Sequence, residues 1–188
     1  MRYIDFKRFM DILLASVLLI FLFPLFILIS FIVYIQDKGP ALYKQKRIGK
    51  DGVKFDFYKF RSMPVDTPLV QSNETYKIKI TRFGRFIRRT NLDELPQFYN
   101  VLIGDMSFIG PRPPIPSQLD LIEYRRINGS LKLRPGLTGL AQINSFNGMT
   151  PKQKSEYDGE YVNNLTFKTD LIILIKTVKY FTKTPPTY

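Results

Sequence analysis

Residues 12–35 read ILLASVLLIFLFPLFILISFIVYI and contain no charged residue in 24 positions. Nineteen of them are Leu, Ile, Phe or Val, which favours bilayer insertion by roughly 6 to 11 kcal/mol before the Pro and Ser penalties. A straight helix of this length extends about 36 Å, enough to cross the hydrocarbon core of a membrane. A chain of 188 residues is too small to bury so many large apolar side chains on all sides. The stretch therefore predicts a membrane-embedded N-terminal segment.

Pro24 lies in the middle of this stretch and predicts a kink, because proline removes one backbone hydrogen bond from a helix. Cationic residues flank the stretch on both sides: Arg2, Lys7 and Arg8 before it, and Lys38, Lys44, Lys46, Arg47 and Lys50 after it. The positive-inside bias would then place both ends in the cytoplasm, as a helix–break–helix that enters the membrane and returns. An ordinary kinked spanning helix is the alternative that these residues leave open.

The chain as a whole is strongly basic, with 28 Lys and Arg against 16 Asp and Glu and a formal net charge of +12. Such an excess attracts nucleic acid, anionic lipid or phosphorylated small molecules. Cysteine, histidine and tryptophan are absent, which excludes a disulfide scaffold, a Cys/His zinc site and a His-based triad. Acid–base or nucleophilic chemistry must therefore come from Asp, Glu, Lys, Ser or Tyr.

The polar part of the chain predicts a mixture of strands and helices. Residues 42–48 and 53–60 flank Gly49-Lys50-Asp51-Gly52 and predict a β-hairpin. Alternation along its second strand places Lys59 and Arg61 on the same side as Phe55 and Phe57, so these two cations require an anionic partner. Residues 64–80 and 106–116 predict loops, and residues 134–138 predict a turn.

Three helices are predicted between these loops. Residues 81–89 carry arginines on one side and Phe83, Phe86 and Ile87 on the other. Residues 92–103 predict a second helix, and residues 117–128 a third one with Ser117 as its N-cap. The core positions expected in the second helix are Leu92, Leu95, Tyr99 and Leu102.

The tail, residues 167–181, is amphipathic. Its apolar stripe consists of Phe167, Leu171, Leu174, Val178 and Phe181, and the lysines outside the stripe are Lys168, Lys176, Lys179 and Lys183. We interpret it as a helix lying in the membrane surface. A helix that closes a soluble core is the alternative.

Asp93 and Glu94 form the most suggestive pair of carboxylates. Pro96 fits only the first turn of a helix, so the pair lies at a helix start, where exposed N–H groups favour anions. A carboxylate held ionised there, near several arginines, suits a nucleophile for phosphorus or a ligand for magnesium (Mg2+). Simple helix capping is the plainer interpretation.

Arginines near this pair are candidates for binding phosphate. Arg112 lies between Pro111 and Pro113, and a guanidinium on a stiff backbone suits bidentate phosphate binding, although a rigid surface turn would have the same sequence. The cluster at the first predicted helix, Arg82, Arg85, Arg88 and Arg89, also fits a solvated face that contacts anionic lipid. Together these features describe an anionic-substrate site beside a membrane.

Three segments, read in order, closely resemble the bacterial sugar transferases, also called monotopic phosphoglycosyl transferases. The segments are FYKFRSM at residues 57–63, LDELPQ at 92–97 followed by GDMSFIGPRP at 104–113, and RPGLTGLAQ at 134–142. The similarity covers nearly the whole chain, including the apolar segment. It implies transfer of a sugar-1-phosphate from a UDP-sugar to polyprenyl phosphate, such as undecaprenyl phosphate, with release of UMP. In such proteins this is the first membrane step of bacterial glycoconjugate assembly.

The resemblance also implies roles for individual residues. Asp93 would attack the β-phosphorus to give a covalent phosphosugar–aspartate, and Asp93 with Glu94 would position Mg2+. Lys59, Arg88 and Arg112 would hold phosphates, and we place Arg61 with them. A direct transfer, in which Asp93 and Glu94 serve only the metal, is the mechanistic alternative.

The resemblance favours a re-entrant anchor with the active site on the cytoplasmic face of the bacterial inner membrane. Such a helix breaks at a Ser-Pro pair in the family, whereas this chain has Phe23-Pro24 and lacks that hydroxyl. The chain also departs from the family after Gln142, in a loop that we expect to contact the nucleotide sugar.

We therefore predict an α+β fold with a re-entrant N-terminal helix, a small β-hairpin and several helices at the cytoplasmic membrane surface. Residues 1–38 would form the anchor, kinked at Pro24, and residues 39–188 the catalytic domain with an interfacial C-terminal helix. Expected partners are a UDP-sugar, polyprenyl phosphate and anionic membrane lipids, without nucleic acid. The alternative function is a membrane-anchored, non-catalytic module that binds anionic lipid or nucleic acid.

Overall fold

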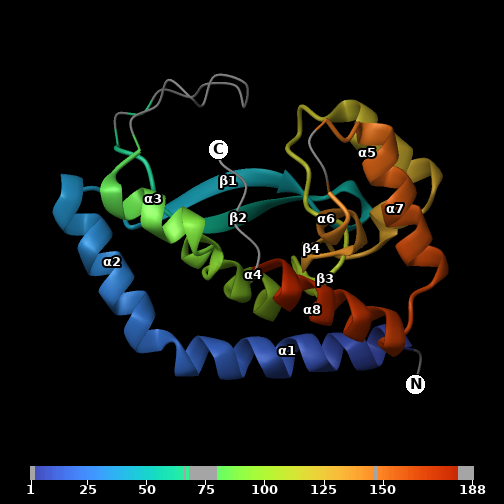
Figure 1. Ribbon diagram of the computed structural model, residues 1–188, viewed down its shortest axis with the longest axis horizontal. Helices are drawn as coiled ribbons and strands as arrows, with labels where there is room; N and C mark the ends of the chain where they lie inside the picture. The colour runs from blue at the N-terminus through green and yellow to red at the C-terminus, as the bar shows by residue number, and fades with distance from the viewer. Residues whose placement is uncertain (1–2, 66, 68–79, 146–147, 182–188) are drawn as a thin grey trace.

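The computed structural model describes residues 3–65, 67, 80–145 and 148–181. Helices and two small sheets make up this part of the chain, which confirms the predicted α+β class. The longest helix lies along the base of the molecule, and most of the other elements lie on one side of it (Figure 1). Most of the predicted loop at 64–80 lies outside the described residues.

Two helices form the apolar N-terminal segment, α1 (Tyr3–Phe21) and α2 (Phe23–Asp37). Their axes are bent by 61° at Leu22, and Pro24 lies in the first turn of α2. The break thus occurs where Pro24 predicts it. Within the described residues, no single helix has both the length and the apolar composition to cross a membrane, whereas α1 and α2 have them together as a bent pair.

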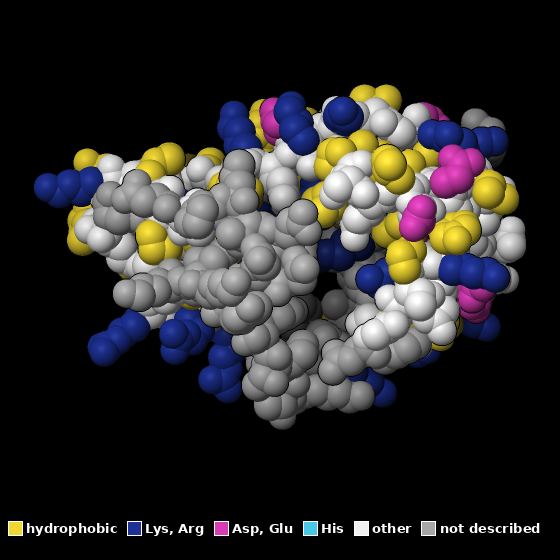
Figure 2. All heavy atoms as spheres, turned by 90° about the horizontal axis from the view of Figure 1, so that it is seen from above, with side chains coloured by type: hydrophobic (Ala, Val, Ile, Leu, Met, Phe, Trp, Pro, Cys, Tyr) yellow, Lys and Arg dark blue, Asp and Glu magenta, His cyan; other side chains and the backbone are white. Residues whose placement is uncertain are grey.

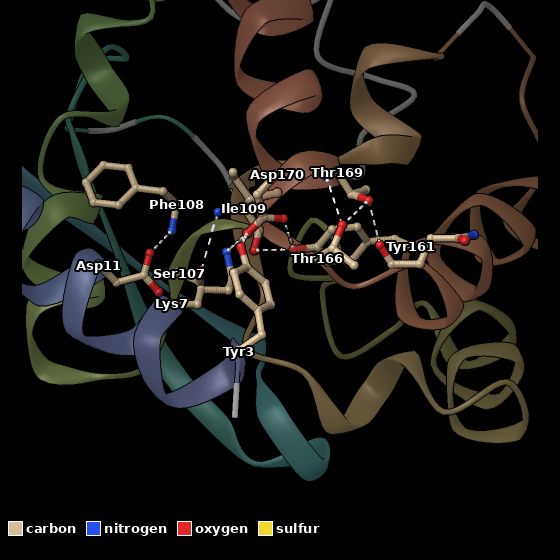
Figure 3. A network of polar contacts seen from close by, with 11 residues as sticks. Tyr3, Lys7, Asp11, Ser107, Phe108, Ile109, Tyr161, Thr166, Thr169 and Asp170 are labelled. Carbon is tan, nitrogen blue, oxygen red and sulfur yellow. Dashed lines mark hydrogen bonds and ion pairs between the residues drawn. The ribbon is translucent and has the colours of Figure 1, made fainter. Parts of the chain in front are cut away.

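One face of α1 is bound to the rest of the molecule by polar contacts. Lys7 donates to a carboxylate oxygen of Asp170 at 2.7 Å, and Asp11 accepts a hydrogen bond from the backbone N–H of Phe108 at 3.1 Å (Figure 3). Arg8 donates to the carbonyl oxygens of Val101 and Leu102, at 2.6 and 2.9 Å. Two of the cations expected to flank a membrane segment are therefore used inside the protein.

The other face of α1 is apolar and exposed, as is most of α2. The exposed side chains of α1 include Ile4, Phe6, Phe9, Leu13, Val17 and Ile20. On α2, only Ile29 and Val33 are fully buried among the large apolar residues. An apolar surface of this extent on a described protein face marks a site of interaction with a membrane or a partner.

The predicted hairpin is confirmed. Strand β1 (Leu42–Ile48) pairs antiparallel with β2 (Lys54–Phe60), and a short 3-10 turn, η1 (Lys50–Gly52), joins them. Phe57 packs with Ala15 of α1 and Val101, while Phe60 packs on the opposite side of the strand with α2. Because helices cover both sides of β2, its alternation of buried and exposed residues ends at Phe60.

The helix predicted at 81–89 is confirmed as α3 (Arg82–Arg89), which begins at Thr81 with its hydroxyl accepting the Gly84 N–H at 2.8 Å. The single helix predicted at 92–103 is wrong. Two elements replace it: a 3-10 turn, η3 (Leu92–Glu94), and an α-helix, α4 (Gln97–Ile103), which begins only after Pro96.

The buried face of α4 also differs from the prediction, because Tyr99 is 48 % exposed and Asn100 is fully buried. The Asn100 side chain donates to the carbonyl of Asp56 at 2.7 Å and accepts from the N–H of Tyr58 at 3.2 Å. A buried polar side chain thus fastens α4 to β2, which apolar periodicity alone does not reveal.

The loop predicted at 106–116 and the turn at 134–138 each contain a strand instead. Strand β3 (Ser107–Ile109) pairs in parallel with β4 (Gly136–Thr138). The backbones approach closely here, since a β-carbon on Gly136 would lie 2.1 Å from the amide nitrogen of Gly110. Only glycine fits at this distance.

The remaining helices are α5 (Leu119–Ile127), the short η4 (Ser130–Lys132), α6 (Leu140–Ile143) and α7 (Pro151–Asn163). The prediction that Ser117 caps α5 is wrong: Gln118 is the N-cap residue, and its side chain accepts a hydrogen bond from the N–H of Ile115 at 3.1 Å. That hydrogen bond folds the chain back before α5 begins.

The amphipathic tail forms α8 (Phe167–Phe181). It buries a narrow face that includes Asp170 and Ile173, whereas Phe167, Leu171, Leu174 and Val178 of the predicted stripe are exposed. The side chain of Phe181, and Lys183, lie outside the described residues. Ile173 belongs to a buried cluster with Ile109 and Tyr161, so α8 covers part of the core with one face and leaves the predicted stripe exposed on another. Its position in a membrane surface stays a prediction.

Candidate active site

Asp93 and Glu94 lie on η3, between the end of α3 and the start of α4. Asn91 has a left-handed conformation with φ of 54°, which turns the chain sharply between α3 and η3. Asp93 is buried, with 6 % of its surface exposed. The turn therefore places a buried carboxylate in the first turn of η3, shortly before α4 begins.

Glu94 brings two of the predicted phosphate-binding cations together. One of its carboxylate oxygens accepts hydrogen bonds from Lys59 of β2 and from Arg112 of the loop after β3, both at 2.9 Å. Burial alone would raise the pKa of Glu94, but Arg112 and Lys59 hold it at about 2. Glu94 is thus a permanent anion that anchors both cations.

Asp93 behaves in the opposite way. Burial raises the pKa of Asp93, and the neighbouring charge of Glu94 adds to the rise, while Lys59 and Arg88 oppose it. A carboxylate with a raised pKa is more basic, and hence more nucleophilic, than an ordinary one. The two adjacent carboxylates are therefore chemically different.

Arg88 is held beside Asp93 by a residue that the sequence did not single out. Its Nε donates to the hydroxyl of Ser62 at 2.7 Å, and Ser62 is buried. Helix α3 approaches Ser62 closely, because a β-carbon on Gly84 would lie 2.0 Å from the Ser62 carbonyl oxygen. Gly84 therefore lets α3 dock where Arg88 can reach the site.

Arg61 occupies a different place from Lys59 and Arg112. Its guanidinium donates to the carbonyl oxygen of Val33 near the end of α2, at 3.4 Å, and its backbone N–H donates to Ala41. The alternation that predicted a shared side for Lys59 and Arg61 ends at Phe60, where both sides of the strand are covered. A role for Arg61 in binding phosphate stays a prediction.

Arg47 of β1 belongs to the site, although sequence reasoning counted it only as a flanking cation. Its guanidinium donates to the carbonyl of Pro113 at 3.2 Å and lies 5.3 Å from the centre of the Phe57 ring, as does the Lys59 ammonium. Burial and the nearby Arg112 lower the pKa of Arg47 to about 10. The hairpin alternation could have placed Arg47 and Lys59 on the same side as Phe57, because Arg47 pairs with Phe55 and Gln45 pairs with Phe57.

The backbone of the Arg112 loop is fixed from below. Arg125 of α5 donates to the carbonyl of Arg112 at 2.7 Å and forms a buried ion pair with Asp158 of α7, also at 2.7 Å. The arginine predicted to be rigid through its two prolines is thus held by a buried ion pair as well.

The described residues contain no group of three or more Asp, Glu, His or Cys side chains placed to hold a metal ion. Asp93 and Glu94 supply two adjacent carboxylates. Magnesium usually takes one or two carboxylates and completes its shell with water and substrate phosphates. The pair therefore fits an Mg2+ ion shared with a phosphorylated substrate.

The face of the molecule away from α1 is rich in cations. Figure 2 shows Lys and Arg side chains along the edges of this face and on one side of a hollow in it, while Asp and Glu side chains lie mainly toward the end that carries α5 and α7. This charge distribution suits the approach of an anionic substrate.

The model of one protein family, described as bacterial sugar transferase, matches residues 2–184. The chain belongs to the bacterial sugar transferase family. The family resemblance predicted from the three sequence segments is thereby confirmed. This bacterial sugar transferase matches over its whole described length, from α1 to α8.

Several relatives of this bacterial sugar transferase carry names that state an activity. A UDP-glucose:undecaprenyl-phosphate glucose-1-phosphate transferase of Klebsiella pneumoniae is 41 % identical over 185 residues, which cover 92 % of this chain and 39 % of that protein. An undecaprenyl-phosphate galactose phosphotransferase of Salmonella typhimurium is 39 % identical over 194 residues, with 92 % and 40 % covered. The exopolysaccharide production protein ExoY of Rhizobium meliloti is 36 % identical over 189 residues, with 92 % and 83 % covered. The chain thus spans about two fifths of the first two relatives and most of the third.

Proposed function

We propose that this bacterial sugar transferase is a phosphoglycosyl transferase, which moves a sugar-1-phosphate from a UDP-sugar to polyprenyl phosphate, such as undecaprenyl phosphate. The observation that carries the proposal is the arrangement around Asp93. A buried carboxylate with a raised pKa lies beside an anionic Glu94 that gathers Lys59 and Arg112. Relatives named as UDP-glucose:undecaprenyl-phosphate glucose-1-phosphate transferases support the same substrates.

The reaction would proceed in two displacements at one phosphorus atom. First, an oxygen of ionised Asp93 bonds to the β-phosphorus of the UDP-sugar, and the bond from that phosphorus to the bridging oxygen breaks, so that UMP leaves with the electron pair. Then a phosphate oxygen of polyprenyl phosphate bonds to the same phosphorus, and the bond to Asp93 breaks. Both nucleophiles are anions already, so neither step needs a proton acceptor, in keeping with a chain that has no histidine.

The cations around Glu94 would offset the charge of the approaching phosphates. Lys59 and Arg112 are both within 2.9 Å of Glu94, and Arg88 is held next to Asp93 by Ser62. Preorganised cations of this kind stabilise charge that develops on phosphoryl oxygens without reorganising during the reaction.

Asp93 and Glu94 would hold an Mg2+ ion together with the substrate diphosphate. When bound, such an ion supplies positive charge that neutralises phosphoryl oxygens and favours departure of the UMP leaving group. We expect Asp93 to serve both the metal and the phosphorus, since Glu94 already accepts two hydrogen bonds from cations.

We further propose that the bent pair of α1 and α2 enters the cytoplasmic leaflet of the bacterial inner membrane and returns, and that α8 lies in the membrane surface. The 61° bend, the exposed apolar faces of α1 and α2 and the exposed stripe of α8 support this placement. It would bring the active site to the level where a polyprenyl phosphate presents its headgroup.

The decisive experiment is UMP release by the detergent-purified chain with Mg2+, undecaprenyl phosphate and a panel of UDP-sugars. We expect release with one sugar, dependent on the lipid phosphate and abolished in Asp93→Asn, with Asp120→Asn on the exposed start of α5 as the matched control. Incubation with the donor alone should add the mass of one sugar-phosphate to the wild-type protein but not to Asp93→Asn. Turnover by folded Asp93→Asn would exclude Asp93 as nucleophile, and folded wild type that is silent across broad donor panels would favour the non-catalytic binding module.

A further inference from the structure

A small pocket lies between the start of α1 and the turns η1 and η4, away from Asp93. Its charged lining consists of Lys7, Arg8, Lys50, Lys132, Arg134 and Asp11. Five cations thus line a space with one carboxylate, and one of the five, Lys7, is already paired with Asp170 at 2.7 Å. No hydrogen bond or ion pair joins these residues to Asp93 or Glu94 of the candidate active site. The volume is about 90 Å³. This is room for roughly three water molecules, or for one tetrahedral phosphate group, but not for a nucleotide.

The single carboxylate of the pocket is already used, because Asp11 accepts the N–H of Phe108 at 3.1 Å. Two guanidinium groups meet at one wall, where Arg8 donates to the carbonyl of Leu102 and Arg134 to that of Gly104, at 2.9 and 2.8 Å. The last carbonyls of α4 balance part of this charge.

The positive charges of Lys50 and Lys132, which also line the pocket, are balanced only weakly by anionic side chains of the described residues. Lys50 is half exposed and lies 3.9 Å from the exposed carboxylate of Asp51. Lys132 makes no side-chain hydrogen bond or ion pair with any other described residue. Both can turn toward an anion in the pocket, whose lining also includes the buried residues Ser107 and Tyr161.

The pocket opens beside an apolar surface. Ile4, which also lines it, is 48 % exposed on α1, and the exposed Phe6 of α1 contacts Phe167 of α8 with ring centroids 6.4 Å apart. A phosphate bound in the pocket would therefore have apolar side chains next to it, which fits the acyl chains of a lipid and not a free ion.

We propose that this pocket binds the phosphate of an anionic membrane phospholipid and so holds the start of α1 at the bilayer surface. The proposal rests on the proposed membrane association of the chain, but not on the phosphoglycosyl transfer. Free inorganic phosphate could bind the same cations, so the experiment must distinguish the lipid phosphate from the free ion.

The test is calorimetric binding of short-chain dioctanoyl phosphatidylglycerol to the full chain in a zwitterionic detergent. Dioctanoyl phosphatidylcholine and inorganic phosphate serve as comparison ligands. In the double variant Lys50→Gln/Lys132→Gln we expect roughly 10- to 30-fold weaker binding of phosphatidylglycerol, since each lysine near a lipid headgroup contributes about a factor of 5. The matched control, Lys54→Gln/Lys152→Gln, removes two exposed lysines outside the pocket and should bind as the wild type does.

Tight binding of phosphatidylglycerol with weak binding of phosphate and phosphatidylcholine, lost in the pocket variant alone, supports the proposal. Equal binding by the pocket variant, or no preference for phosphatidylglycerol over phosphatidylcholine, overturns it. Phosphate that binds as tightly as the lipid overturns the lipid as the source. Flotation with neutral vesicles measures membrane association separately, and UMP release measures the transfer, so failure of each is recognised on its own.

Discussion

Asp93 and Glu94 are neighbours in the chain, yet their pKa values shift in opposite directions. Burial raises the pKa of Asp93, whereas Arg112 and Lys59 overcome the effect of burial at Glu94 and hold its pKa at about 2. Pairs of carboxylates whose environments separate their pKa values commonly have separate roles. At the scale of residues, Glu94 holds the two cations, and the proposed function assigns the reaction with phosphorus to Asp93.

Asp93→Asn should abolish transfer and at the same time stabilise the fold near neutral pH. An acid with a folded-state pKa above its unfolded value contributes stability below the unfolded pKa, which is lost as the pH rises through the folded pKa. The neutral amide avoids this cost at pH 7. Thermal unfolding at pH 7 should therefore show a higher Tm for Asp93→Asn than for the wild type, and a clearly lower Tm would contradict the buried, raised-pKa environment.

Glu94→Gln should have the opposite effect on stability. A depressed pKa of about 2 means that Glu94 stabilises the fold above its unfolded pKa and loses that contribution as the pH falls through about 2. Replacement leaves Lys59 and Arg112 without their shared anion. We expect a loss of roughly 1 to 3 kcal/mol in the free energy of unfolding at pH 7, discounted for partial exposure, and none for the exposed control Glu156→Gln, both measured by urea unfolding.

The pH dependence of the first half-reaction should report Asp93. Release of UMP with the donor alone involves no lipid phosphate, and Glu94 stays ionised down to about pH 2. The acid limb of the single-turnover rate constant for UMP release should therefore lie above about 3.9, the ordinary pKa of an aspartate, and this rate constant should fall as the pH falls through it. A limb at or below the ordinary value would show that the free enzyme does not raise the pKa of its nucleophile.

At the scale of elements, the bend between α1 and α2 has two causes, Pro24 and the packing of both helices against β2. Ala15 of α1 is packed against Phe57, and Ile29 and Val33 of α2 are packed against Phe60, so each arm is fastened to the same strand. The missing backbone bond at Pro24 permits the bend, and packing fixes its angle.

Pro24→Ala alone should therefore leave the bend in place. The chain contains no cysteine, so Phe9→Cys and Ile35→Cys, both on exposed positions, give a unique pair of spin labels. The distance between them, measured by pulsed electron resonance, should be unchanged in Pro24→Ala and longer in Pro24→Ala/Phe60→Ala. A longer distance in Pro24→Ala by itself would make proline the sole cause of the bend.

Helices and strands were predictable from the sequence where a single local pattern of residues determined them. The hairpin followed from alternation around a glycine turn, and α3 from arginines on one side and apolar residues on the other. Strands β3 and β4 were not predictable, because residues 107 and 136 pair across the chain through a glycine contact that no local pattern contains. The break at Pro96 was visible, but its consequence for the buried face was set by Asn100.

The candidate site shows the same division. Lys59, Arg88, Arg112 and the two carboxylates were predicted from their chemistry and from the family resemblance, and the fold brings them together. Ser62 belongs to the site because its hydroxyl accepts a hydrogen bond from Arg88. Arg47 belongs to it because its guanidinium donates to the carbonyl of Pro113 in a loop that is distant in sequence. Such contacts depend on tertiary packing and not on the type of residue at a given spacing.

At the scale of the whole molecule, Asp170 joins three helices. It accepts hydrogen bonds from Tyr3 at 2.5 Å and Lys7 at 2.7 Å on α1, and from Tyr161 of α7 at 2.6 Å (Figure 3). The same Tyr161 also reaches the carbonyl of Ile109, the last residue before the Arg112 loop segment begins. Helix α1 and the loop that carries Arg112 are thus tied to one buried carboxylate.

Asp170→Asn should destabilise the fold by roughly 3 to 5 kcal/mol, because it leaves a largely buried lysine without its partner. Tyr3→Phe, which removes one hydroxyl donor from the same carboxylate, should cost only about 1 kcal/mol. Thermal and urea unfolding of the full chain measure both, with Asp120→Asn as the exposed control. Equal effects of Asp170→Asn and Asp120→Asn would show that the buried contact contributes nothing.

The contact between Tyr3 and Asp170 joins residues that are 167 positions apart. A ribosome that adds roughly 5 to 20 residues per second needs about 8 to 33 s to make the second partner after the first. For most of that interval α1 exists without Asp170, so the Tyr3 hydroxyl and the Lys7 ammonium on its inner face lack their protein partner. The contacts that fasten α1 to α8 can therefore form only after residue 170 has been made, and any pause in translation before that residue delays them.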